Sequence, residues 1–183
     1  MNRTSAEIQK EIIAKFGFFP PFFAPALDTP DILENLWQQT LSAYLNNPIP
    51  ALFKEKLAAM LARYCSVPYC LMCHSSNLSP LGMSASEVLE LLETAPLNSA
   101  QLNLMTQDFD DTRRLGWPEA GSKIEDAVLS CCISIFLSQD TEFCQKKLKS
   151  FLEPHLYQYL NIFLAYNRTA LSWAELNPEL SAF

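Results

Sequence analysis

The sequence predicts an all-α protein, a single-domain helical bundle of six to eight helices. Glycine is scarce, with 4 residues against 12 prolines, so few of the tight turns that β-hairpins need are available. Prolines divide the chain into segments whose apolar residues recur every three or four positions, which is the helical period. A length of 183 residues with 49% hydrophobic residues suits one domain. We expect that domain to span residues 1–183.

The first half of the chain predicts four helices. Residues 1–16 have an amphipathic pattern with charges throughout. Residues 30–46 open on a threonine-proline pair that suits a helix start, and their apolar positions follow one face. A third helix covers residues 50–65. A serine-valine-proline sequence then indicates a new cap, so a fourth helix begins at Pro68.

The second half predicts further helices on the same periodicity. Their ranges are 86–94, 99–113, 122–137, 142–152 and 154–176.

Charge and motifs exclude several classes of function. A net charge of -7 disfavours binding to nucleic acid, which needs an excess of Lys and Arg. No glycine-rich phosphate-binding loop can be written in the sequence. The longest nearly uncharged stretch, residues 127–137, is far shorter than the ~20 residues of a membrane-spanning helix. Since the N-terminus has no apolar run of signal-peptide length, we expect a cytoplasmic protein with reduced thiols.

Reactive residues concentrate in one segment. Three of the six cysteines and one of the two histidines lie between Cys65 and His74. A helix that starts at Pro68 has Cys70 in its first turn, where unpaired N–H groups and the helix dipole favour a thiolate. We therefore expect a lowered pKa, which makes Cys70 the most acidic thiol. His74 follows at i+4 and can exchange a proton with it, and Cys73 follows at the C-x-x-C spacing that permits a disulfide.

The stretch from Glu55 to His74, EKLAAMLARYCSVPYCLMCH, resembles the core motif of the AhpD-like alkylhydroperoxidases in the carboxymuconolactone decarboxylase family. In that motif a glutamate on one helix precedes a C-P-Y-C-x-x-x-H element at the start of the next. Glu55 matches the glutamate, Cys70 the second cysteine and His74 the histidine. Val67 replaces the first cysteine. The resemblance implies an AhpD-like helical domain.

The resemblance also implies a function, a thiol-dependent peroxidase that reduces organic hydroperoxides. In the family the second cysteine attacks the hydroperoxide, which gives Cys70 the role of attacking thiolate. Glu55 and His74 would form the proton relay. An external thiol or a lipoyl-type partner would reduce the oxidised protein, and family members form homo-oligomers.

Val67 leaves the resolving step open. Cys73 or Cys65 could act as the resolving thiol, Cys70 could work alone with an external thiol, or peroxidase activity could be lost. We favour Cys73 because helical spacing places it beside Cys70, whereas Cys65 lies across a helix cap.

Three other chemistries use the same residues. C-x-x-C-H is also the attachment motif of c-type haem, which requires an export route. Zinc could take Cys65, Cys70, Cys73 and His74, but His74 would point about 100° away from Cys73 around a helix. We therefore expect neither a metal nor a cofactor. The main alternative is a cysteine-independent decarboxylase-like enzyme that acts on lactone acids, or a small-molecule-binding member of the same family.

The remaining candidates are expected to be structural. Cys131, Cys132 and Cys144 lie in apolar helical segments and are interpreted as buried, unreactive thiols, and Cys65 taken alone has the same interpretation. The aromatic run at residues 18–23 could line a pocket or an interface, but we interpret it as core.

Overall fold

Nine α-helices, three 3-10 helices and one π-helix make up the fold in the computed structural model, which describes residues 3–110 and 116–181. No strand occurs in these two ranges. The all-α class is confirmed. The nine α-helices in the described residues are one more than the six to eight expected of the bundle, and they equal in number the ranges that the periodicity indicated. The α-helices are α1 (Ser5–Phe16), α2 (Pro30–Gln39), α3 (Ala51–Tyr64), α4 (Pro68–Leu78), α5 (Ala85–Glu93), α6 (Ser99–Met105), α7 (Lys123–Phe136), α8 (Thr141–Phe151) and α9 (Pro154–Leu176).

The short elements lie between these helices. The π-helix is η2 (Thr40–Leu45), and the 3-10 helices are η1 (Pro21–Ala26), η3 (Gln107–Asp110) and η4 (Pro178–Ser181). The predicted helix over 30–46 therefore divides into α2 and η2. The predicted helix over 99–113 ends early, at Met105, and its last three residues lie outside the described part of the chain.

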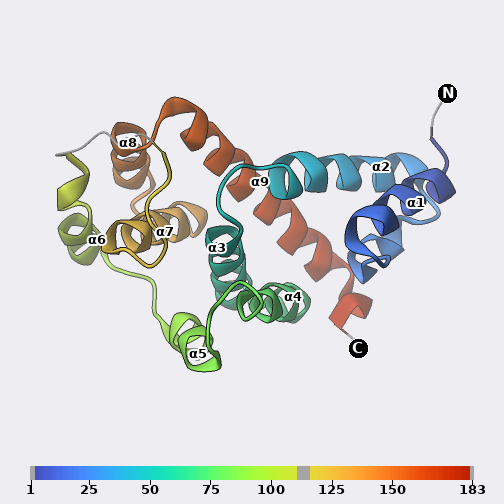
Figure 1. Ribbon diagram of the computed structural model, residues 1–183, viewed down its shortest axis with the longest axis horizontal. Coiled ribbons are helices and arrows are strands. Elements are labelled where there is room, and N and C mark those ends of the chain that lie inside the picture. Colours follow the sequence, from blue (N-terminus) through green and yellow to red (C-terminus); the bar gives the residue numbers. More distant parts are fainter. Residues whose placement is uncertain (1–2, 111–115, 182–183) are drawn as a thin grey trace.

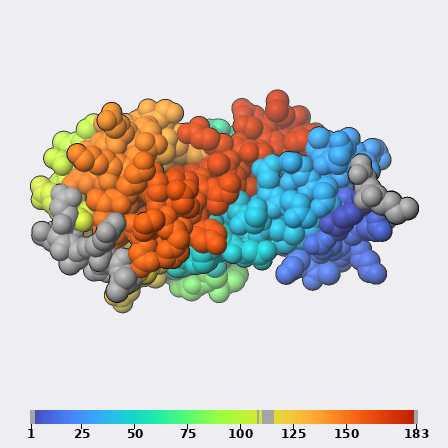
Figure 2. All heavy atoms as spheres, turned by 90° about the horizontal axis from the view of Figure 1, so that it is seen from above, coloured from blue at the N-terminus to red at the C-terminus, as the bar shows by residue number. Residues whose placement is uncertain are grey.

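The molecule is elongated, with α3 and α4 at its centre (Figures 1 and 2). Helices α6, α7 and α8 gather at one end, and α1 and α2 lie at the other. Helix α9 runs between the two ends and passes the central pair. No helix in the described ranges has the length and apolar character needed to cross a membrane.

Two apolar clusters hold these elements together. The smaller one packs α1, η1 and α2 around Trp37, and the larger one packs α3, α4 and α6–α9 around residues such as Phe53 and Phe163. Phe22 and Trp173 pack against both clusters and so join them. Burial of this apolar surface is the main stabilising contribution.

Helix α3 is buried along nearly its whole length, even at charged positions. Lys54, Glu55 and Lys56 are each less than 10% exposed. A buried charge is costly unless it is paired or hydrogen-bonded. Each of these three side chains therefore needs a polar partner supplied by a neighbouring element.

The cysteines divide into two groups. Cys70, Cys131, Cys132 and Cys144 are buried. Cys65 is exposed, contrary to the interpretation of a buried thiol, because it is the C-cap residue of α3 and lies where the chain leaves the core.

Candidate active site

Glu55 lies at the centre of a hydrogen-bonded group in the middle of the molecule. The His74 ring nitrogen Nδ1 is 2.8 Å from Glu55 Oε2, and Asn77 Nδ2 donates to the same oxygen at 3.3 Å. The Tyr44 hydroxyl donates to the other oxygen, Oε1. The structure therefore brings together Glu55 and His74, which the sequence paired, and adds two partners.

These partners set the charge state of Glu55. Burial raises its pKa, but the hydrogen bond and the charge of His74, with hydrogen bonds from Tyr44 and Asn77, outweigh burial and lower the pKa below its ordinary value. An ionised Glu55 holds a proton of His74 on Nδ1 in both the charged and the neutral ring. In the neutral ring, Nε2 is the nitrogen that can accept a proton.

Helix α4 presents its reactive residues at helical spacing. Pro68 occupies its first turn, as predicted, and Val67 is its N-cap. Cys73 lies three residues after Cys70 and His74 lies four residues after it. At these spacings both side chains are neighbours of Cys70 on the helix surface.

Tyr44 comes from the π-helix η2, and sequence periodicity did not single it out for the site. A π-helical turn changes the direction of side chains relative to an α-helix, and such turns are frequent at functional sites. The Lys54 ammonium fixes this turn by donating to the backbone oxygens of Tyr44 at 2.6 Å and Asn47 at 3.0 Å. Lys54 thereby obtains polar partners, and the Tyr44 hydroxyl is held against Glu55.

A cavity of about 380 Å³ lies beside this group. The three reactive residues of α4 form part of its wall, and most of the remainder is aromatic. The lining residues are Phe16, Phe18, Pro20, Pro21, Phe22, Tyr44, Tyr69, Cys70, Cys73, His74, Ser76, Asn77, Tyr166 and Ala170. The volume is that of a site for a small organic molecule.

The N-terminal aromatic segment forms one wall of the cavity. Its position is fixed at Phe22, whose N–H donates to the Tyr69 hydroxyl at 2.9 Å and whose carbonyl accepts from Trp173 Nε1 at 2.9 Å. Phe18 is 58% exposed beside the cavity. The interpretation of residues 18–23 as core is therefore wrong for Phe18, whereas Phe23 is buried in the smaller cluster and Phe22 both packs against the two clusters and lines the cavity.

Cys70 differs from the prediction in its acidity. Burial raises its pKa to about 12, and the neighbouring Cys73 thiol adds to that effect. The expected lowering by the helix N-terminus is therefore wrong, because desolvation of a side chain only 4% exposed outweighs the dipole. Cys70 is a neutral thiol that needs a base before it can act as a nucleophile.

Cys73 and Cys65 have different positions relative to the cavity. Cys73 is exposed and forms part of the cavity wall with Cys70. Cys65 is not part of this wall, and Val67, in the position of the missing cysteine, is buried. Cys73 is thus the second thiol that the structure places beside Cys70.

The exposures predict an order of alkylation. Burial raises the pKa of all three thiols of this segment, so accessibility decides the order. At pH 7, iodoacetamide should modify Cys65 and Cys73 before Cys70, because the first two residues are exposed and Cys70 is buried. Peptide mapping after short exposures measures this order. Faster labelling of Cys70 than of Cys65 would contradict the burial described above.

Within residues 3–110 and 116–181, no group of three or more His, Cys, Asp or Glu side chains is arranged to hold a metal ion.

In comparisons with known proteins, no family model, curated protein or solved structure matches the chain.

Proposed function

We propose that this protein is a thiol-dependent peroxidase that reduces organic hydroperoxides, as the AhpD-like resemblance implies. One observation carries the proposal: a partly buried Glu55–His74 hydrogen bond lies beside a cavity whose wall contains Cys70 and Cys73. A carboxylate that orients a histidine beside a nucleophile is a recurring arrangement in nucleophilic catalysis.

The first chemical step uses His74 as general base. Nε2 of His74 accepts the Cys70 proton as the thiolate sulfur attacks the outer oxygen of the hydroperoxide. The O–O bond breaks, the alkoxide takes the proton back from His74, and an alcohol leaves. Cys70 becomes a sulfenic acid. Glu55 stabilises the imidazolium that forms in between, which offsets the high pKa of Cys70.

The second step uses Cys73. Its thiol attacks the sulfur of the Cys70 sulfenic acid, which gives a Cys70–Cys73 disulfide and releases water. An external dithiol of the lipoyl type then reduces the disulfide by exchange and is itself oxidised. The exposure of Cys73 supports this order, because the reductant needs an accessible sulfur.

The cavity wall favours an uncharged, apolar substrate. Its described lining is mostly phenylalanine, tyrosine and proline and includes neither lysine nor arginine. A lactone acid brings a carboxylate that such a wall leaves without a lysine or arginine partner. This supports an organic hydroperoxide over the substrate of the decarboxylase-like alternative.

We also propose that the protein is a cytoplasmic homo-oligomer, following the resemblance. Sedimentation at micromolar concentration tests the oligomer, and a monomer there would contradict it.

A coupled assay tests the peroxidase directly. Cumene hydroperoxide should be consumed catalytically when the protein is supplied with dihydrolipoamide, and one alcohol should form per peroxide. A rate equal to that of dihydrolipoamide alone would reject the proposal.

A variant of Cys73 tests the resolving role. Cys73→Ser should stop at the sulfenic acid, so one equivalent of cumene hydroperoxide should give a Cys70 adduct with dimedone and no disulfide. Further peroxide should over-oxidise Cys70. Cys65→Ser is the matched control, because Cys65 is also exposed but lies outside the cavity wall. Loss of the disulfide in Cys65→Ser with its retention in Cys73→Ser would transfer the role to Cys65.

A further inference from the structure

A second hollow lies on another side of α3 from the candidate active site. Lys56 follows Glu55 in the sequence, so its side chain leaves α3 about 100° away. The hollow has a volume of about 540 Å³ and lies among α3, α5, α6 and α7. Its lining residues are Lys56, Met60, Met83, Glu87, Glu90, Leu91, Thr94, Leu97, Met105, Gly121, Asp126, Leu129, Ser130 and Ile133.

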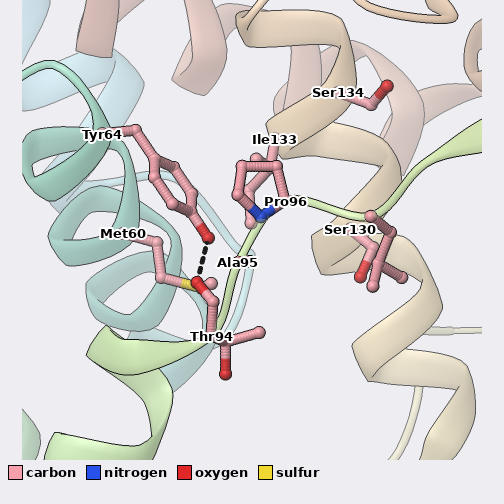
Figure 3. Close-up of a pocket in the computed structure, with 9 residues that line it drawn as sticks. Met60, Tyr64, Thr94, Ala95, Pro96, Ser130, Ile133 and Ser134 are labelled. Carbon is pink, nitrogen blue, oxygen red and sulfur yellow. Dashed lines mark hydrogen bonds between the residues drawn. The ribbon is translucent and has the colours of Figure 1, made fainter.

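Figure 3 shows the adjoining part of this hollow, a smaller pocket that shares Met60, Thr94 and Ser130 with it. The Tyr64 hydroxyl donates to the Thr94 carbonyl at 2.7 Å and ties the end of α5 to α3. The segment after Thr94 then passes between α3 and α7 (Figure 3). The Tyr64–Thr94 hydrogen bond fixes the end of α5 at the edge of the hollow.

Seven of the fourteen described residues that line the hollow are methionine, leucine or isoleucine. Three methionines, Met60, Met83 and Met105, contribute to its wall, and methionine side chains adjust to ligands of different shape. Helix α5 has no buried residue, and its Leu91 is only half-buried above the hollow. An amphipathic helix usually buries its apolar face, and the face of α5 is only partly covered by the larger cluster, against which Leu91 packs.

Charge around the hollow is unbalanced. Lys56 is the one cationic side chain among the described residues of the lining, against the carboxylates of Glu87, Glu90 and Asp126. Glu87 already accepts two hydrogen bonds from Ser84 at the start of α5, so Glu90 and Asp126 are the carboxylates left for a ligand. The Lys56 ammonium is already 3.1 Å from Oε2 of Glu125, a residue only 1% exposed. The carboxylates of the lining therefore outnumber its single ammonium, which already has a partner outside the lining.

We propose that this hollow binds a hydrophobic amine, with the apolar part against the methionines and leucines and the ammonium group near the carboxylates of Glu90 and Asp126. A ligand of the same shape that ends in a carboxylate meets like charges there and binds less well. This site is separate from the proposed peroxidase centre and does not depend on it.

Calorimetric titration at pH 7 with octylamine, octanol and octanoate tests the proposal on the unmodified protein. Octylamine should bind about tenfold more tightly than octanoate, and its affinity should fall as salt rises, since part of the preference is electrostatic. Asp126→Asn should lower the affinity for octylamine by about fivefold and leave the affinity for octanol unchanged. Equal affinity for all three ligands, or no binding of octylamine at millimolar concentration, would overturn the proposal.

Two further variants locate the ligand. Ser130→Trp places a large side chain in the hollow and should abolish octylamine binding, while Phe18→Ala alters the other cavity and should leave it unchanged. Glu90→Gln changes an exposed residue and provides an independent test if Ser130→Trp does not fold. This variant should lower the affinity for octylamine, as Asp126→Asn does. Octylamine binding that is lost in Phe18→Ala but kept in Glu90→Gln would assign the ligand to the other cavity and reject the site.

Discussion

Cys70→Ser should abolish peroxide reduction, to at most about 10⁻³ of the activity of the unmodified protein. The serine hydroxyl is a far weaker nucleophile and cannot form a sulfenic acid, so the proposed cycle has no first step. The measurement is the rate of cumene hydroperoxide consumption with dihydrolipoamide as reductant. Because serine differs from cysteine by one atom and Cys70 lies at the cavity wall, the fold should be retained.

Cys132→Ser is the matched control. Cys132 is also buried, at 0% exposed, but it lies on α7 and is not part of the cavity wall. This variant should lose stability, since it buries a hydroxyl in an apolar cluster, and keep its turnover. Activity retained in Cys70→Ser, or lost equally in both correctly folded variants, would remove Cys70 from the chemistry.

Glu55→Gln should lower peroxide turnover by roughly 10²-fold, the usual share of one group in general acid–base catalysis. A neutral amide cannot stabilise the His74 imidazolium as the carboxylate does. The glutamine oxygen can still accept from Tyr44, which keeps part of the hydrogen-bonded group. Glu11→Gln is the control, since it makes the same change in a half-exposed ion pair on α1. Equal effects of the two substitutions would exclude a special role for Glu55.

The same variant should change how stability depends on pH. The folded-state pKa of Glu55 is lowered, so its carboxylate stabilises the fold fully above the ordinary pKa near 4.5 and loses that effect as pH falls through the folded value. The difference in melting temperature between the unmodified protein and Glu55→Gln should therefore shrink from pH 6 to pH 3. A constant difference over that range would show that Glu55 is not ionised in the fold.

Helical period and proline positions were sufficient to predict the fold class and most helix starts. Pro68 begins α4, and this fixes the spacing of Cys70, Cys73 and His74 on one face. The contact between Glu55 and His74 follows from two adjacent helices, which the family resemblance indicated. These predictions rest on local rules of spacing and capping, and such rules hold when a helix has a regular period.

Other features depend on tertiary surroundings that a local pattern does not contain. Tyr44 reaches Glu55 because a π-helical turn interrupts the regular period, and Lys54 holds that turn from another helix. The raised pKa of Cys70 arises from burial, which local sequence gives no measure of. Phe18 lines a cavity although its sequence neighbours favour a core position, because the N-terminal segment lies beside α4.

Mass spectrometry of the thiols after one equivalent of cumene hydroperoxide tests whether Cys70 and Cys73 carry out the peroxide chemistry. We expect a loss of two hydrogens from the intact protein and a disulfide between Cys70 and Cys73 in the peptide map. A Cys65–Cys70 disulfide would keep the peroxidase and change the resolving thiol. Six free thiols after an excess of hydroperoxide would contradict thiol catalysis altogether.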